Sequence, residues 1–484
     1  MVRVRFAPSP TGPFSIGNAR TALYNWLFAR HEGGEFFLRI EDTDKERSKP
    51  EYEEDVLAGL TWLGFTWDNK EIMRQSERGK VYEEALTKLL NEGRAYYCFC
   101  TPDELEADRQ AQMSQGISPK YGGKCRHMPK EEAAKKLATT PAVIRFAMPL
   151  REVGFEDLVR GKVRMNTDLI GDIVIAKDIR SPLYNFSVVV DDAAMEITHV
   201  IRGEDHLSNT PKQMMIAEAL GVAVPTYAHL PLILGPDKKK LSKRNLEGSL
   251  NDYRRQGYLP EAVLNFLVLL GWHPVKDREV LTREEMVAEF ALKRVQKGGA
   301  VFNDEKLLWL NREHLKSLPI ETVLEHLSTF VPAEWKKRPA FLKKVVEVER
   351  GRIKTLHEFT EIADPFFTLP EYPASLLIWK ETPKDQVVKN LEDAEGLIST
   401  TSEKRFVSAE LEPQLFELAN RTGRGEFLWP LRVALSGREM SPGPLELMEV
   451  LGKEEALRRI RHALELLTGG TLAPARPAGG PAHA

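Results

Sequence analysis

The sequence has little cysteine and no long apolar run. Its 3 cysteines in 484 residues are too few and odd in number for a disulfide framework, and they favour a reducing compartment. A membrane-spanning helix needs roughly 20 consecutive apolar residues, and the longest candidate, residues 262–272, is interrupted by polar residues. The first residues lack the apolar core and cleavage site of a secretory signal. We therefore expect a soluble, multidomain, cytoplasmic protein without a membrane segment.

An excess of charge of one sign is also absent. The chain has 68 Lys and Arg against 71 Asp and Glu, a formal charge of 68 − 71 = −3, and 42% of its residues are hydrophobic. This composition excludes a collagen-like or disordered protein, and the length allows about three domains. Taken alone, the charge argues against a nucleic-acid partner, because phosphate-binding surfaces are usually basic.

The common nucleotide-binding loops are missing. Without G-x-x-x-x-G-K-[ST] or G-x-G-x-x-G, a P-loop ATPase or a dinucleotide oxidoreductase is disfavoured. Residues 8–18, PSPTGPFSIGN, instead join a predicted strand, Val2–Ala7, to a predicted helix that Asn18 would cap and Gly33-Gly34 would end. Gly17 lets a flat ring or a phosphate approach the backbone, and a helix start offers free N–H groups. The alternative is an ordinary surface loop rich in proline and glycine.

The order of predicted elements indicates an α/β fold. The first strand, the helix and a second strand over Phe36–Ile40 form one βαβ unit, which predicts a parallel sheet. We expect further strands over Phe186–Val190 and Ile197–Ile201, each followed by charged residues, where open α/β sheets bind ligands. Residues from about 100 to 185 would form a separate lobe inserted in this fold.

The second half of the chain has a helical pattern. From about Pro260 onward the apolar spacing is almost wholly helical, with examples over Glu261–Leu270 and Leu445–Leu467. The last stretch, Gly469–Ala484, is rich in Gly, Pro and Ala and lacks an apolar face, which predicts a disordered tail.

A basic segment follows Gly235-Pro236-Asp237. Residues 238–244, KKKLSKR, carry five positive charges in seven positions. Such a loop can neutralise a triphosphate whose charge shifts during phosphoryl or adenylyl transfer. The alternative is a solvated charged surface.

All three cysteines lie in one region. Cys98 and Cys100 form one pair, and Cys125 and His127 form another after 24 intervening residues. Three thiolates and one imidazole can make a tetrahedral zinc site, and four protein ligands leave no position for water, so the zinc ion would be structural. The alternative is three buried free thiols and a surface histidine.

The two loops together resemble the HIGH and KMSKS signatures of class I aminoacyl-tRNA synthetases. Five segments narrow the resemblance to the bacterial glutamyl-tRNA synthetase family, in the family's order: RFAPSPTG (5–12), LRIEDTD (38–44), VVDD (189–192), HVIRGEDH (199–206) and KLSKR (240–244). Residues 257–262 and 302–311 extend the likeness, which is strong over residues 2–312 and weaker to about residue 466. A shorter paralogue that glutamylates a tRNA base lacks the anticodon-binding half that this chain has.

The resemblance implies a fold and a division into domains. The fold would be a Rossmann-like α/β catalytic domain with an inserted zinc-containing lobe that binds the tRNA acceptor end, followed by an all-α anticodon-binding half. The implied segments are 1–97 and 185–235 for the two halves of the catalytic fold, 98–184 for the lobe, 236–322 for the KMSKS loop and stem-contact helices, 323–468 for the anticodon-binding region and 469–484 for the tail.

The resemblance also implies an activity and its residues. A monomer would activate L-glutamate with ATP and Mg²⁺ and transfer it to tRNA(Glu), and whether it also charges tRNA(Gln) stays open. The glutamate site would comprise Arg5, Ala7, Ser9, Glu41, Tyr184 and Arg202. The ATP site would comprise Ser15, Gly17, Asn18, Lys240, Ser242 and Lys243, of which Ser15, Gly17, Lys240 and Lys243 would act in catalysis. Arg352 and Arg432 would contact the anticodon, the alternative for Arg352 being a solvated helix arginine.

One position departs from the family pattern. Where the HIGH signature begins with histidine, this chain has Ser15. A serine hydroxyl can donate one neutral hydrogen bond to the ATP phosphates but cannot be a cation. Two interpretations follow: an active enzyme in which other donors compensate, or a catalytically weakened or silent tRNA-binding paralogue.

Overall fold

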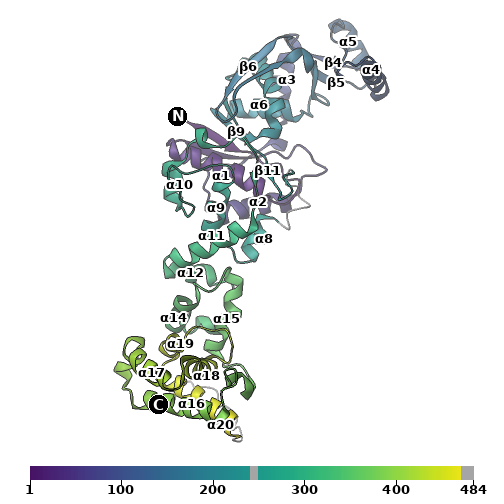
Figure 1. Ribbon diagram of the computed structural model, residues 1–484. Coiled ribbons are helices and arrows are strands. Elements are labelled where there is room, and N and C mark those ends of the chain that lie inside the picture. The colour runs from purple at the N-terminus through teal and green to yellow at the C-terminus, as the bar shows by residue number, and fades with distance from the viewer. Residues whose placement is uncertain (240–248, 470–484) are drawn as a thin grey trace, which may run out of the picture. The chain divides into compact units, whose positions relative to one another are not determined.

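The computed structural model describes residues 1–239 and 249–469 (Figure 1). The chain divides into two compact units, Met1–Leu310 and Asn311–Ala484, each described below on its own. The finer division predicted from the sequence stays a prediction.

The first unit contains a parallel sheet at its centre. One ladder has the order β1-β2-β3, and a second has the order β7-β6-β10-β9, in which only β7 is antiparallel to its neighbour. The N–H of Thr198, just before β9, donates to the carbonyl of Arg3 in β1 at 2.9 Å, so these two strands lie side by side. The strands are β1 (Arg3–Phe6), β2 (Glu35–Ile40), β3 (Met73–Arg74), β6 (Glu152–Asp157), β7 (Gly161–Asn166), β9 (His199–Gly203) and β10 (Thr226–Leu230). The strands predicted near residues 2–7, 36–40 and 197–201 are confirmed.

Helix α1 (Ile16–His31) connects β1 to β2 and lies against β1 and β9 (Figure 1). Its N-cap is Ser15 and not Asn18, so that prediction was wrong. Ser15 has the extended backbone of a cap, with φ −86° and ψ 158°, and its Oγ accepts a hydrogen bond from the N–H of Asn18 at 3.3 Å. The helix therefore starts one turn earlier than the apolar spacing indicated.

The strand predicted over Phe186–Val190 is wrong, because these residues belong to helix α6 (Tyr184–Ala194). A short apolar run fits a buried strand and a buried helix equally well. Here all five residues of the run are buried, so no polar face reveals the helical period. Asp191 and Asp192 consequently lie in the last turn of a helix and not beyond a strand.

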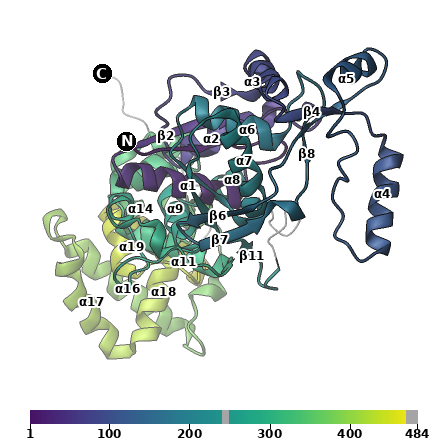
Figure 2. The ribbon, with the colours of Figure 1, turned by 90° about the horizontal axis from the view of Figure 1, so that it is seen from above.

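A small antiparallel sheet carries the cysteine region. It has the order β4-β5-β8, with β4 (Ala95–Cys98), β5 (Val143–Phe146) and β8 (Ile173–Ala176). Helices α4 (Pro102–Ser114) and α5 (Lys130–Leu137) lie at the edge of the first unit near β4 (Figures 1 and 2). Neither helix has a fully buried residue, and the apolar cluster beside them is small, with Cys98, Phe99 and Cys125 at its centre.

The remaining elements of the first unit complete its core. The apolar cluster includes α1 residues together with Trp272 and Phe290. A short parallel pair, β11 (Ile233–Leu234) with β12 (Ala300–Val301), interrupts the helical pattern expected after residue 260. The helices are α2 (Pro50–Trp62), α3 (Gly79–Asn91), α7 (Thr210–Leu220), α8 (Leu250–Arg255), α9 (Pro260–Leu269), α10 (Arg283–Glu289) and α11 (Asp304–Ser317), the last of which passes the division between the units.

The second unit is all-helical in its described part, as predicted. The helix predicted over Leu445–Leu467 is, however, two helices, because Gly452 has φ +82° and ψ 163°, a conformation that ends α19. Of the predicted tail, only Gly469 lies within the described residues. The helices are α12 (Ile320–Leu327), α13 (Ala333–Lys336), α14 (Pro339–Glu349), α15 (Phe359–Phe367), α16 (Lys384–Thr400), α17 (Ser408–Thr422), α18 (Arg424–Ser436), α19 (Pro444–Leu451) and α20 (Lys453–Thr468).

Within the described ranges, no helix combines the length and the apolar character that crossing a bilayer requires.

Candidate active site

A cleft of about 1650 Å³ opens where β1 and β9 end. This is the place where an open parallel sheet reverses its strand order and binds ligands. The cleft is lined by every predicted glutamate-site and nucleotide-site residue in the described part of the chain: Arg5, Ala7, Ser9, Ser15, Gly17, Asn18, Glu41, Tyr184 and Arg202. Lys240, Ser242 and Lys243 lie outside the described residues.

The start of α1 lies on the cleft wall. The hydroxyl oxygen of Ser15 accepts a hydrogen bond from the N–H of Asn18. The N–H groups of Ile16 and Gly17 lie in the first helical turn, where backbone N–H groups have no acceptor within the helix. A Cβ atom on Gly17 would meet only Ser15 Oγ, at 3.9 Å, so the space beside this backbone is open. The helix start can therefore receive an anionic group.

A buried ionic network, the ionic floor, lies under the cleft: Arg5 and Glu41 line the cleft, and Arg39 and Asp192 lie behind them. Asp192, from α6, accepts hydrogen bonds from Arg5 at 3.1 and 3.3 Å and from Arg39 at 2.6 Å. Arg39 also donates to Glu41 at 2.8 Å. Burial alone would raise the pKa of Asp192, but Arg5 and Arg39 lower it overall. Two cations and two carboxylates thus balance in charge.

Glu41 keeps a raised pKa in spite of its partner. Burial raises the pKa of this carboxyl, and the nearby Arg39 opposes the rise only in part. A ligand ammonium beside Glu41 would favour the charged carboxylate. Because Glu41 lines the cleft, it can accept a cationic group of a ligand.

Arg202, at the end of β9, lacks this balance. Its side chain is buried, yet among the described residues it makes no ion pair with a carboxylate. Its Nη1 donates to Gln213 Oε1 and its Nη2 to Thr210 Oγ1, both at 2.8 Å, and both acceptors are neutral. A buried cation without a counter-ion is costly. Arg202 can therefore bind a carboxylate of a ligand.

Two neighbours of Arg202 face the same space. Tyr184 Oη lies 3.0 Å from Nδ1 of His206 and 3.5 Å from Nη1 of Arg202. Burial, aided by the charge of Arg202, lowers the pKa of His206 to about 4, so this ring is neutral at physiological pH. Its neutrality leaves Arg202 as the only charged side chain among these three neighbours.

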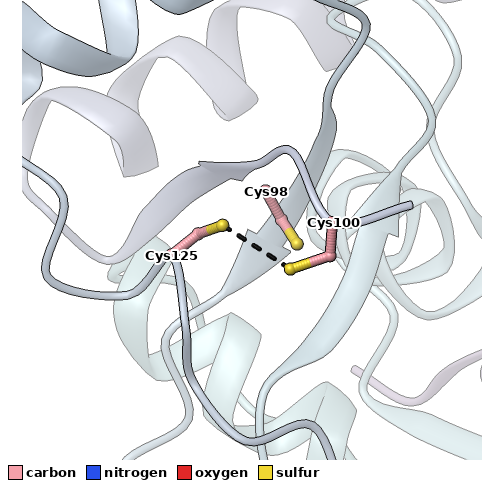
Figure 3. A group of neighbouring side chains, drawn as sticks. All are labelled: Cys98, Cys100 and Cys125. Carbon is pink, nitrogen blue, oxygen red and sulfur yellow. Dashed lines mark hydrogen bonds between the residues drawn. The ribbon is translucent and has the colours of Figure 1, made fainter. Parts of the chain in front are cut away.

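The three cysteines form a separate cluster in the small sheet. Their sulfur atoms lie within 4.8 Å of one another, and those of Cys100 and Cys125 are 3.7 Å apart (Figure 3). His127 is exposed and is not part of this group. The hydroxyl of Tyr121 lies 3.4 Å from the sulfur of Cys98 and 3.5 Å from that of Cys100.

The thiols of this cluster have unequal acidities. Burial would raise the pKa of Cys98, but hydrogen bonds from Tyr121, from the Cys100 backbone and from Arg145 lower it overall. Burial raises the pKa of Cys100 to about 11. The guanidinium of Arg145 lies 3.9 Å from the centre of the Tyr121 ring, so a cation stands beside the group. This cation favours the thiolate form of Cys98, whereas burial keeps the Cys100 thiol protonated in the absence of a metal.

The comparisons with known proteins agree with this geometry. Residues 1–309 match the family described as tRNA synthetases class I (E and Q), catalytic domain. The glutamate–tRNA ligase of Aquifex aeolicus is 45% identical over 478 residues, which cover 96% of this chain and 99% of that protein. That of Thermodesulfovibrio yellowstonii is 44% identical, with 96% of this chain and 100% of that protein covered.

The chain belongs to the glutamate–tRNA ligase family. Residues 320–464 match an anticodon binding domain. A crystal structure of a glutamate–tRNA ligase from Elizabethkingia meningosepticum, in complex with its amino acid, superimposes with a TM-score of 0.82 at 36% identity and covers 96% of this chain and 99% of that one. The predicted family and the predicted fold class, an α/β catalytic domain followed by an all-helical anticodon domain, are confirmed.

In this family member the two predicted anticodon arginines lie near each other. Arg352 donates to the carbonyl of Ser441 at 3.0 Å and pairs with buried Glu349 at 3.0 Å. Arg432, in α18, lies over the Trp429 ring at 4.7 Å, and burial together with the charge of Arg352 lowers its pKa. Arg352 lies in the turn after α14 and not in a helix, which corrects the expected setting.

Several residues of this ligase-family site were not predicted from the sequence. Arg39, Asp192 and His206 take part through contacts between distant segments. His206 had a detectable signal, because it follows the end of β9 within RGEDH. Asp192 also had a detectable signal, within VVDD, but the sequence predicted a strand over residues 186–190 where the structure has a helix, so Asp192 was expected beyond a strand.

Proposed function

We propose that the protein activates L-glutamate with ATP and transfers the glutamyl group to the 3′ end of tRNA(Glu). Family membership supports the reaction class, and buried, uncompensated Arg202 in the cleft supports an amino acid with an anionic side chain. Neither observation favours a silent tRNA-binding paralogue, which remains an outcome of the test below. The reaction would take place in the cytoplasm, and a monomer suffices for it.

The substrate glutamate would be held by its charged groups. Arg202 can take a carboxylate in planar, bidentate fashion, and Glu41 can receive the α-ammonium. Arg5 shares Asp192 with Arg39 and would supply the second cation of the wall. The remaining contacts would come from Ala7, Ser9 and the hydroxyl of Tyr184, which line the same cleft.

The reaction would need no protein nucleophile. The glutamate α-carboxylate attacks the α-phosphorus of ATP, the bond to the β-phosphate oxygen breaks, and pyrophosphate leaves. The 2′-hydroxyl of the terminal tRNA ribose then attacks the acyl carbon, and AMP leaves. Catalysis comes from positioning and from stabilising charge on the phosphates. We assign that work to Ser15, Gly17 and Asn18 at the start of α1 and to Lys240, Ser242 and Lys243, with Mg²⁺ arriving on ATP.

Ser15 provides the test of activity. We would measure ATP–pyrophosphate exchange with glutamate in the presence of tRNA, for the natural protein and for Ser15→His. The proposal predicts measurable exchange by the natural protein, because its helix amides and lysines compensate for the missing imidazole. Absence of exchange by the natural protein, with recovery in Ser15→His, would instead establish the silent paralogue.

We also propose a structural zinc ion at the cysteine cluster. Tetrahedral zinc with Zn–S bonds near 2.3 Å separates two sulfur ligands by about 3.8 Å and a sulfur and an oxygen ligand by about 3.5 Å. The 3.7 Å between Cys100 and Cys125 and the 3.4 and 3.5 Å to the Tyr121 hydroxyl fit these values. Cys98, Cys100 and Cys125 would hold the ion, with Tyr121 better placed than exposed His127 as the fourth ligand.

The zinc ion would anchor helices α4 and α5, which lie beside only a small apolar cluster around Cys98, Phe99 and Cys125. Helices α4 and α5 bury no side chain, and small folds of this kind commonly depend on a metal. We assign the lobe to the tRNA acceptor end. Metal analysis of freshly purified protein should give one zinc ion per chain, and a content near zero would refute the site.

The second unit would read the anticodon. We propose that Arg352 and Arg432, which lie close together, contact anticodon bases by their edges or faces, as guanidinium groups do in single-stranded RNA. Arg352→Ala should change the ratio of charging rates with tRNA(Glu) and tRNA(Gln). Unchanged kinetics with both tRNAs would show that Arg352 is only a surface arginine.

A further inference from the structure

A buried pair lies behind Arg202, outside the cleft lining. His229, in β10, is 0% exposed, and Asp157, at the end of β6, is 2% exposed. Neither residue lines the cleft. The proposed reaction therefore assigns no direct role to either, although the imidazole contacts the guanidinium of Arg202.

Asp157 fixes the orientation of His229. Its Oδ1 accepts the backbone N–H groups of Val159, Arg160 and His229 at 3.0, 2.8 and 3.2 Å. Its Oδ2 lies 2.6 Å from Nδ1 of His229. One carboxylate oxygen thus secures the backbone, and the other is reserved for the imidazole.

The contact with Arg202 determines where the imidazole proton lies. Arg202 Nε, which can only donate, lies 3.2 Å from Nε2 of His229. The hydroxyl of Thr210, whose oxygen already accepts from Arg202 Nη2, lies 3.1 Å from the same Nε2 and can donate its proton to it. Nε2 must therefore be an acceptor, and the single ring proton lies on Nδ1, where it is donated to Asp157. Burial lowers the pKa of His229 in spite of the opposing effect of Asp157, which agrees with a neutral ring.

We propose that His229, oriented by Asp157, is a positioning residue that holds the Nε edge of Arg202 and keeps its terminal nitrogens directed at the substrate carboxylate. The proposal deepens the proposed function and rests on it. Neutral His229 orients Arg202 without neutralising it, whereas a carboxylate in the same place would compete with the substrate for the cation. Thr210 and Gln213 hold the other two nitrogens by equally neutral acceptors.

The first test distinguishes the hydrogen-bond acceptor of His229 from the volume that its side chain fills. His229→Leu should raise the glutamate KM about 10- to 100-fold, because Arg202 Nε loses its buried acceptor, while KM for ATP and tRNA changes by less than about twofold. His229→Gln, whose amide oxygen can accept from Nε, should return the glutamate KM to within about threefold of the natural value. Equal changes in all three KM values, or no change in His229→Leu, would overturn the proposal.

The second test inverts the tautomer. Asp157→Asn keeps an oxygen for the three backbone N–H groups but presents an amide donor to Nδ1, which forces the ring proton onto Nε2 and against Arg202. The glutamate KM should rise as in His229→Leu, with the melting temperature within a few degrees of the natural protein. An unchanged glutamate KM in folded Asp157→Asn would contradict the proposal.

A spectroscopic measurement adds a readout independent of kinetics. In ¹⁵N-histidine-labelled protein at neutral pH, the resonances absent from the His229→Gln spectrum should show a protonated Nδ1 and an unprotonated Nε2. A protonated Nε2 would overturn the proposal. Failure of the proposed function is a separate result, because the natural protein itself would then lack glutamate-dependent activity.

Discussion

Ser15 has a structural role that a histidine at the start of the HIGH signature need not have. Its hydroxyl oxygen accepts the N–H of Asn18 and closes the first turn of α1. The hydroxyl proton remains available to a ligand in the cleft, so capping and phosphate contact can coexist. The residue thus connects the stability of α1 with the proposed nucleotide site.

Replacing Ser15 by alanine should therefore lower stability. Ser15→Ala removes the cap and should reduce the free energy of unfolding by about 1 kcal/mol. Ser15→Thr, which retains a capping oxygen, is the matched control and should lose less. Urea denaturation of the three proteins measures the difference, and equal midpoints for all three would contradict the capping role.

Asp192 is the residue on which the ionic floor of the cleft depends. Asp192→Asn leaves Arg5 and Arg39 buried without their shared counter-ion and should cost about 3–5 kcal/mol at neutral pH. Denaturant unfolding measures this loss. A cost below about 1 kcal/mol would show that the two arginines do not rely on Asp192.

The pH dependence of this effect has a definite sign. Because the two arginines hold the pKa of Asp192 below its usual value, its contribution is fully present above the unfolded pKa of about 3.9. The contribution is lost as the pH falls through the lower folded pKa. The difference in the free energy of unfolding between the natural protein and Asp192→Asn should therefore become smaller below about pH 4. A difference that grows on acidification would contradict the role of Asp192 as the counter-ion of the two arginines.

Some of the site residues could be predicted from the sequence and others could not. The cleft residues could be predicted because they lie in short segments whose type and order resemble a family. The roles of Arg39 and His229 could not be predicted, because they arise from contacts between residues far apart in the sequence. Arg39 contacts Asp192, about 150 positions away, and His229 contacts Arg202, 27 positions away. The spacing that suggested His127 as a ligand does not fix where its side chain lies, and His127 is exposed and outside the sulfur cluster.

Among the elements, the apolar pattern predicted the long helix α1 and failed for a short buried run, because only a long run distinguishes a helix from a strand. Strand β2 was predicted near its true bounds, and helix α1 ends where predicted but begins one turn earlier. Helix α6 is buried all round the 186–190 run, so its period could not be detected. The break between α19 and α20 depends on one backbone conformation at Gly452, which the continuous Leu, Glu and Arg pattern concealed.

Gly452 should tolerate no side chain for conformational reasons alone. No atom lies within 4 Å of a Cβ built there, yet φ +82° with ψ 163° is essentially restricted to glycine. Gly452→Ala should cost about 1–3 kcal/mol. The control is Gly396→Ala, at an exposed and equally open site within α16, which should stabilise by about 0.5–1 kcal/mol. Thermal unfolding measures the stability change in both variants, and equal changes would contradict the conformational explanation for Gly452.

Substitutions of Tyr121 and His127 test which of them is the fourth ligand of the proposed zinc site. Tyr121→Phe removes the hydroxyl that lies beside Cys98 and Cys100, and it should lower zinc affinity at least tenfold. His127→Ala should leave affinity within about twofold, since His127 is exposed and outside the cluster. Competition with a chromogenic chelator measures both values. The reverse order of effects would restore the histidine as the ligand.

For the whole molecule, the formal charge of −3 was a misleading guide to partners. Electrostatic attraction to tRNA depends on where basic residues gather and not on their sum. Residues 238–244 and the pair of arginines near Ser441 supply local basic groups. Acidic residues elsewhere offset them and would limit non-specific binding.

We propose above that this chain charges tRNA(Glu) with glutamate in a cleft where Arg202 selects the side-chain carboxylate. The most direct measurement is aminoacylation of tRNA(Glu) with radiolabelled glutamate or glutamine by the natural protein and by Arg202→Gln. We expect the natural protein to charge glutamate and not glutamine. Arg202→Gln should lose at least about 100-fold in kcat/KM for glutamate, because a buried charge-assisted contact is lost. No charging by the natural protein, or undiminished charging by Arg202→Gln, would contradict it.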